Sequence, residues 1–103
     1  MKLQYKLYRY ATDVIGTDPY EPPLNIVNTV KLARESGNPG QPVWNVIGSF
    51  PASDGTLPTP EYIRAAVYGS LISGARGIFY FSAHFGNYNM VTSTLWEGIK
   101  KLN

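Results

Sequence analysis

The stretch that most constrains the fold runs from Pro58 to Phe85 and has the pattern of a helix, a glycine turn and a strand. Residues 58–61, PTPE, are typical of a helix start, because threonine can cap, proline fits the first position and glutamate complements the dipole. Residues 74–77, GARG, end that helix, and residues 78–81, IFYF, are apolar on both faces. An unbroken apolar strand directly after a helix predicts a parallel sheet that is covered on both sides.

The helix itself carries a stripe of small and branched residues suited to close packing on a sheet. Its members recur at helical spacing and are Ile63, Ala66, Val67, Ser70, Leu71 and Gly74. The same alternation of helix and strand extends along the whole chain. It predicts helix 2–11, strand 12–18, helix 24–36, strand 42–50, helix 60–74, strand 77–82 and helix 92–102, with a loop over 83–90.

Alternating helices and strands at this spacing predict a single α/β domain over residues 1–103 with parallel strands and right-handed crossovers. Leu3, Leu7 and Tyr10 lie on one face of the expected helix at the start, and we expect Trp44 in the core. A (β/α)8 barrel takes roughly 250 residues, so three strand–helix units correspond to part of one. Three strands also leave two exposed edges that something must cover.

Composition excludes several classes of partner. A net charge of +2 without a basic run argues against a nucleic-acid surface, and no stretch approaches a membrane span of roughly 20 apolar residues. The first ten residues lack the apolar region of a signal peptide, and without cysteine there can be no disulfide or thiolate site. We expect no cofactor, because the chain has one histidine, scattered carboxylates and no phosphate-binding glycine loop. Location in the cell stays undetermined.

Three stretches together resemble a known family. They are residues 13–20, DVIGTDPY; residues 41–44, QPVW; and residues 58–61 running into 74–81. In order and spacing they are similar to the C-terminal part, about strands six to eight, of a glycoside-hydrolase-like TIM barrel. The resemblance implies a partial (β/α)8 barrel and a carbohydrate ligand.

The sequence departs from that family at the catalytic carboxylates. The family places an acid/base glutamate after the fourth strand, which would precede Met1, and a nucleophilic glutamate at the end of the seventh strand. Residues 47–50, IGSF, occupy that second place and include no carboxylate. Because glycoside hydrolysis generally needs two carboxyl groups, we do not expect this chain to hydrolyse glycosides alone, and the catalytic residues stay unassigned.

Ligand groups in a barrel or an open α/β sheet gather at the carboxyl ends of the strands. This rule selects Asp18 and Tyr20, then Ser49 and Phe50, then Ser82 and His84, with Phe85 beside them.

Each candidate side chain also has a purely structural interpretation. Asp18 can bind sugar hydroxyls or act as a general base, or it can cap the turn before Pro19. Tyr20 and Phe50 can stack on a pyranose ring or pack beneath loops. His84 can act as an acid or base near neutral pH or make a local hydrogen bond.

Three functions are therefore open. The first is a truncated or fragmentary glycosidase-like barrel segment that binds carbohydrate or is a remnant without catalysis. The second is a self-assembling structural homo-oligomer, in which other copies bury the strand edges and the apolar surface. The third is one half of a split glycoside hydrolase, completed by a second chain that supplies the other strands and an acid/base carboxylate.

Overall fold

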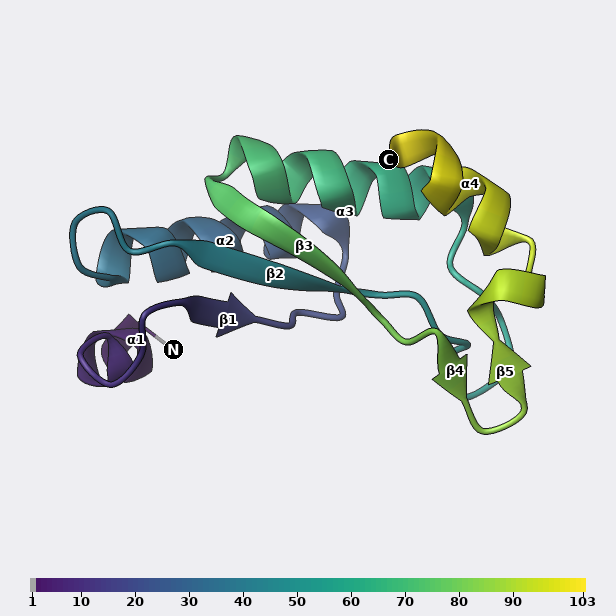
Figure 1. Cartoon of the computed structure of the whole chain (residues 1–103), viewed down its shortest axis with the longest axis horizontal. Coiled ribbons are helices and arrows are strands. Elements are labelled where there is room, and N and C mark those ends of the chain that lie inside the picture. The colour runs from purple at the N-terminus through teal and green to yellow at the C-terminus, as the bar shows by residue number, and fades with distance from the viewer. Residues whose placement is uncertain (1) are drawn as a thin grey trace.

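A computed structural model describes residues 2–103, and its centre is a three-stranded parallel sheet with helices packed on it (Figure 1). The elements are α1 (Lys2–Tyr8), β1 (Ile15–Thr17), α2 (Pro23–Ser36), β2 (Val43–Gly48), α3 (Pro60–Ile72), β3 (Ala75–Phe81), β4 (His84–Phe85), β5 (Tyr88–Asn89), a 3-10 turn (Met90–Thr92) and α4 (Leu95–Leu102).

The strand order is β1-β2-β3, and both neighbouring pairs are parallel. Ile15 lies opposite Val43, and Val46 lies opposite Phe79. The predicted α/β class, with parallel strands that alternate with helices, is therefore confirmed. The sheet is open and does not close into a barrel.

Both crossover helices, α2 and α3, lie on the same face of the sheet and pack against each other (Figure 1). Right-handed connections between successive neighbouring strands produce this arrangement. The helices approach closely at Gly69, where a Cβ atom would come within 2.8 Å of a Val27 methyl group. Helix α4 packs on α3, and α1 packs on α2.

The expectation of a sheet covered on both sides is wrong. Side chains of β2 alternate, so that Val43, Asn45 and Ile47 are buried under the helices while Trp44 points to the opposite face and is 40% exposed. On the same open face Phe79 is 50% exposed and Phe81 is 42% exposed. Trp44 is therefore not a core residue in this chain, because both crossovers place their helices on the other side of the sheet.

The buried polar residue of β2 links three elements. Thr17 of β1 donates its hydroxyl hydrogen to Asn45 Oδ1 at 2.7 Å, and Asn45 Nδ2 donates to Ser70 Oγ of α3 at 2.8 Å. Ser70 in turn donates to the Ala66 carbonyl at 2.6 Å. Thr17, Asn45 and Ser70 are all buried, so this chain of hydrogen bonds ties the strand register to the position of α3.

The C-terminal end of α1 and the exposure of some side chains on α1 and α3 differ from the expectations. Helix α1 ends at Tyr8 rather than at residue 11, so Tyr10 lies beyond it, and both Leu7 and Tyr10 are exposed. Tyr5 is the residue of α1 that packs against the core. The side chain of Leu3, expected on the same helix face, lies outside the described part of the chain. Leu71 on α3 is also largely exposed, because it lies at the margin of the stripe that faces the sheet.

The ends of the strands differ from the expected ranges as well. Strand β1 is only three residues long, strand β2 ends at Gly48 rather than at residue 50, and β3 begins two residues early at Ala75. The expected loop over 83–90 contains the antiparallel pair β4 and β5. Helix α4 begins at Leu95 rather than at residue 92, since Asn89 accepts from the Val91 N–H and stabilises a separate 3-10 turn. No helix in residues 2–103 combines the length and apolar character needed to cross a bilayer.

Replacing Asn45 with alanine should destabilise the fold by about 2–4 kcal/mol. The substitution removes two buried hydrogen bonds and leaves a small void beneath α3. Urea unfolding followed by circular dichroism measures the change. Ser73→Ala is the matched control, because the Ser73 hydroxyl bonds only the Gly69 carbonyl of its own helix, and it should cost less than about 1 kcal/mol. Equal effects of the two substitutions would contradict a special role for Asn45.

Candidate functional site

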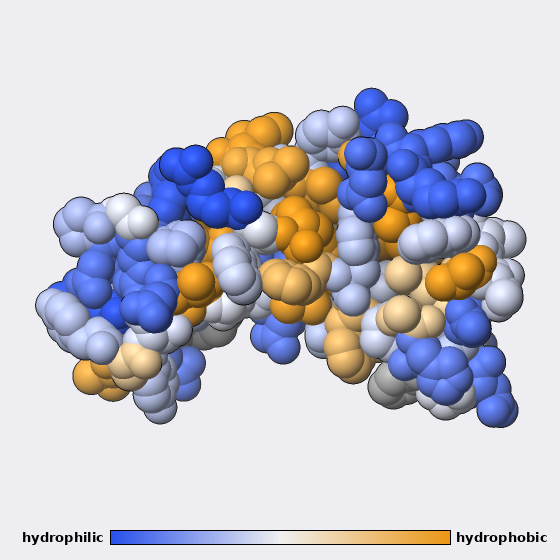
Figure 2. Space-filling model, viewed as in Figure 1, coloured by the Kyte–Doolittle hydropathy of each residue, from blue (hydrophilic) through white to orange (hydrophobic). Residues whose placement is uncertain are grey.

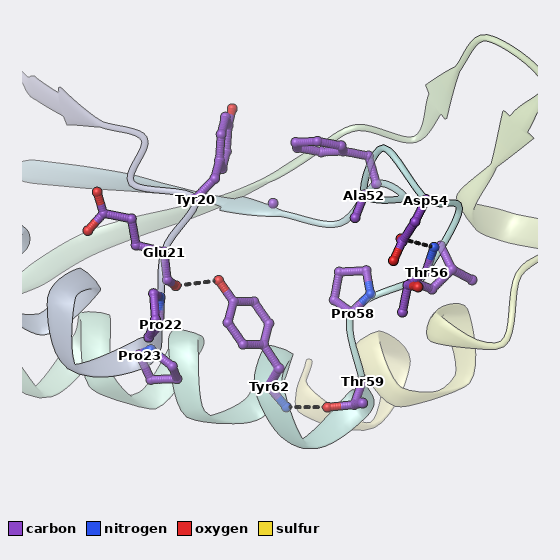
Figure 3. A pocket seen from close by; sticks show the side chains of 13 residues that line it. Tyr20, Glu21, Pro22, Pro23, Ala52, Asp54, Thr56, Pro58, Thr59 and Tyr62 are labelled. Carbon is purple, nitrogen blue, oxygen red and sulfur yellow. Dashed lines mark hydrogen bonds between the residues drawn. The ribbon is translucent and has the colours of Figure 1, made fainter.

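A groove of about 730 Å³ lies at the carboxyl ends of β1 and β2, between the loops that follow them (Figure 3). Tyr20 and Glu21, from the loop after β1, lie on one side of the groove, and Asp54 and Pro58, from the loop after β2, lie on the other. Gly48, the last residue of β2, also lines the groove. The groove therefore lies where the rule for parallel sheets places ligand sites, at the carboxyl ends of the strands.

Tyr62 of α3 joins the two loops at the base of the groove. Its hydroxyl donates to the Glu21 carbonyl at 2.7 Å, and its N–H donates to the Thr59 hydroxyl oxygen at 3.1 Å (Figure 3). The second bond confirms the predicted cap of α3 by Thr59. Burial, and then the charge of Glu21, raise the pKa of Tyr62. The hydroxyl bond holds the Tyr62 ring against the loop after β1, and the ring forms part of the groove wall.

Three aromatic rings meet at this end of the sheet. Tyr20 lies edge-on to Phe50 with ring centroids 5.2 Å apart, and it stacks on Phe81 at 6.4 Å. Phe50 and Phe81 are also edge to face, at 5.8 Å. The Tyr20 ring lies directly on Gly48, where a Cβ atom would come within 2.9 Å of the ring. The sequence selected Tyr20 and Phe50 but missed Phe81, although its place at the end of the third strand is a signal for it.

A second aromatic pair continues along the same face of the sheet. Trp44 and Phe79 have ring centroids 5.3 Å apart, and the Trp44 indole covers Gly77, where a Cβ atom would come within 2.7 Å of it. We call Trp44, Phe79, Phe81 and Tyr20 the aromatic face. A band of hydrophobic residues is also visible across the middle of the molecule in Figure 2, between hydrophilic ends.

Two carboxylates stand near the aromatic cluster. Asp18 is exposed, and its charge adds to burial in raising the pKa values of Tyr20 and Tyr5. Asp54 accepts a hydrogen bond from the Thr56 N–H at 2.9 Å, and this bond lowers the pKa of the Asp54 carboxyl. Asp54 therefore stays ionised at neutral pH beside an apolar groove. Sequence reasoning did not select Asp54 or Tyr62, because both follow the strand ends by several residues.

The remaining predicted site residues lie elsewhere. Ser49 is fully buried, its N–H donates to the Phe81 carbonyl at 2.6 Å, and its hydroxyl has no hydrogen-bond partner within residues 2–103. Ser82 follows a cis peptide bond and donates its hydroxyl to the His84 carbonyl at 2.7 Å. His84 is exposed and pairs with Asn89 in the β4–β5 hairpin, and neither Ser82 nor His84 lines the groove. The side chain of Phe85 lies outside the part of the chain that the structure describes.

The chemistry available at the groove is that of a binding site. Aromatic faces, fixed proline rings and an ionised carboxylate can hold a ligand by stacking and hydrogen bonding. No cluster of three or more potential metal-binding side chains occurs in the part of the chain that the structure describes.

The phenol of Tyr20 should titrate above its ordinary pKa of about 10, and Asp18→Asn should lower that pKa. Removing the carboxylate charge makes the phenolate less unfavourable, whereas the larger effect of burial stays. The Tyr5 pKa should fall with it, while Tyr80, raised by burial alone, should be unaffected. NMR titration of ring-labelled tyrosine measures all three, and an unchanged Tyr20 pKa would rule out the interaction with Asp18.

Raised phenol pKa values also predict the response of the fold to alkali. Between the unfolded pKa of about 10 and the higher folded value, the folded state binds more protons, so the free energy of unfolding should fall as pH rises through this range. Tyr5, Tyr20, Tyr62 and Tyr80 all contribute in this direction. Urea unfolding at pH 9 and pH 11 tests the sign, and greater stability at pH 11 would contradict it.

Comparisons with protein-family models, with curated proteins and with solved structures found no match to this chain. The arrangement of aromatic rings and carboxylates around the groove is therefore the basis for assigning a function.

Proposed function

We propose that this chain is a segment of a glycosidase-like (β/α)8 barrel that binds carbohydrate at the carboxyl edge of its sheet and has no hydrolytic activity of its own. The observation that carries the proposal is the cluster of Tyr20, Phe50 and Phe81 beside the groove. Tyr20 and Phe81 remain 46% and 42% exposed, so their rings are accessible to a ligand.

The topology supports the barrel part of the proposal. The three strands of the main sheet, β1 to β3, follow one another in chain order and are parallel. Both crossover helices lie on one face of this sheet. In a closed barrel the helices form an outer ring and the opposite face of the sheet becomes the packed interior. The aromatic face would then be interior surface, which explains why β2 and β3 carry large apolar residues on the side without helices.

The shape of the groove supports a sugar ligand. A pyranose ring has apolar faces of C–H groups and a rim of hydroxyls, so it needs a flat apolar surface together with polar groups at the sides. Tyr20 and Phe50, whose rings are perpendicular, each provide one flat apolar face, and Asp54 provides acceptors on the side across from Tyr20 (Figure 3). Binding by such a site requires no catalytic group.

The carboxylates argue against hydrolysis by this chain alone. Strand β2 ends in Ile47 and Gly48 and is followed by Ser49 and Phe50, so no carboxylate occupies the place of the nucleophile in the resembling family. Hydrolysis needs two carboxyl groups on either side of the glycosidic bond. A second chain would have to supply at least one of them, which is the split-enzyme alternative.

Tyr20→Ala should weaken the binding of a soluble tetrasaccharide such as cellotetraose by about two- to tenfold, the size of an aromatic stacking contribution. Isothermal titration calorimetry measures the affinity. Tyr68→Ala is the matched control, because Tyr68 is a ring of similar exposure, 48%, that lies beside Arg64 on α3. Failure of the wild-type chain to bind a panel of neutral oligosaccharides would refute the proposal, as would equal affinities of the Tyr20 and Tyr68 variants.

The aromatic face favours self-assembly as a second candidate. Trp44 and Phe79 are large, adjacent and about half exposed, and aromatic residues without charges are enriched at the cores of protein interfaces. A second copy of the chain could bury this face and remove the rings from water. Sheet edges at β1 and β3 would add backbone groups for pairing.

Trp44→Lys combined with Phe79→Lys should convert a self-associated chain to a monomer, because lysine cannot be buried in an apolar interface without a partner. Size-exclusion chromatography with light scattering counts the copies. Tyr68→Lys places the same charge on a different exposed ring and should leave the association unchanged. A monomeric wild-type chain at high micromolar concentration would exclude this candidate. It would not affect the proposal of carbohydrate binding.

A further inference from the structure

The groove is apolar, yet the charges around it have one sign. The residues that line it lie in two segments, 20–23 and 48–62, which contain no lysine, arginine or histidine. They include three of the seven acidic residues of a chain whose net charge is +2, namely Glu21, Asp54 and Glu61, of which Glu21 and Asp54 line the groove. None of the residues that line the groove is cationic, and this charge composition favours a cationic ligand over an anionic one.

Asp54 is the carboxylate placed to meet such a ligand. In Figure 3 it stands with Ala52 and Pro58 across the groove from Tyr20, whereas the Glu21 carboxylate points away from Tyr62 and the groove. The Thr56 N–H holds Asp54 in the ionised form. The positive ends of the α2 and α3 dipoles also lie at this edge, but Glu21 lies just before the Pro22 cap of α2 and Glu61 lies in the first turn of α3. Their negative charges offset the positive ends of the helix dipoles.

The aromatic rings add a second attraction for a cation. Tyr20 and Phe50 line the groove, and an ammonium group over the face of such a ring is attracted by its quadrupole. The same rings stack on an uncharged sugar, so stacking alone does not distinguish a neutral from a cationic saccharide. A positive charge on the sugar would engage both the rings and Asp54.

We propose that the groove selects saccharides that carry a free, protonated amino group, such as a β-linked glucosamine oligomer, over their N-acetylated or amino-free counterparts. This selectivity rests on the proposed carbohydrate binding and adds the chemical class of the ligand. Asp54 is the residue that determines it, and Tyr20 and Phe50 hold the sugar ring in either case.

The test compares three tetrasaccharides on the full chain by calorimetry: glucosamine tetramer, its N-acetylated form and cellotetraose. At low salt the glucosamine tetramer should bind about three- to tenfold tighter than the other two, from an exposed ion pair and a cation–π contact together. In 1 M sodium chloride the difference should disappear, because the Debye length falls to about 3 Å.

Asp54→Asn should weaken binding of the glucosamine tetramer by about two- to fivefold more than it weakens binding of cellotetraose, because the amide loses the charge but keeps an oxygen that can accept from a sugar hydroxyl. The asparagine side chain keeps an oxygen that can accept from the Thr56 N–H, so the loop retains its bond. Glu35→Gln is the matched control: it removes one exposed carboxylate that lies beside Arg34 and Arg76, outside the groove, and should change neither affinity. Circular dichroism establishes that both variants are folded.

Each alternative outcome has a distinct meaning. Equal affinity for all three tetrasaccharides, or tighter binding of a neutral one, overturns the selectivity and leaves carbohydrate binding intact. Binding of none of them overturns both. A tetralysine peptide that binds as tightly as the glucosamine tetramer, with no affinity for cellotetraose, overturns the proposal in favour of a site for cationic peptides.

Discussion

Two right-handed crossovers between neighbouring parallel strands place α2 and α3 on one face of the sheet, and the remaining features of the molecule depend on this arrangement. The covered face takes Val43 and Ile47 into the core, with Asn45 between them. Asn45 bonds Thr17 of β1 and Ser70 of α3, so a shift of one residue in β2 would break two buried hydrogen bonds and expose the apolar side chains. The register that buries Asn45 is the same register that leaves Trp44 on the open face.

On that open face, aromatic rings pack against the backbone at glycine residues. Gly48 and Gly77 lie beneath the rings of Tyr20 and Trp44, at distances that leave no room for a side chain. The absence of a Cβ atom lets each ring approach the backbone closely, and Phe81 and Phe79 lie beside them. The open face is therefore a continuous apolar surface that suits either a barrel interior or an interface with another copy.

The groove differs from the aromatic face in its charge. Tyr20 belongs to both, but only the groove has the ionised Asp54 carboxylate and hydrogen-bonded loops beside its rings. A sugar, with apolar faces and a polar rim, matches this mixture, whereas a protein partner matches the purely apolar strip around Trp44 and Phe79. The two proposed roles thus use neighbouring surfaces and do not exclude each other.

The sequence by itself determined the class of fold, because alternating helix and strand patterns, the Thr59 cap and the unbroken apolar strands are local signals. It also placed Tyr20 and Phe50 at the carboxyl edge, since that position follows from strand direction. Only the tertiary structure decided which face of the sheet stays open, that Ser49 is buried, and that Ser82 and His84 leave the groove for the β4–β5 hairpin. It also brought Asp54 and Tyr62 to the groove. These outcomes depend on crossover handedness and on contacts between residues far apart in the chain, which a local pattern does not specify.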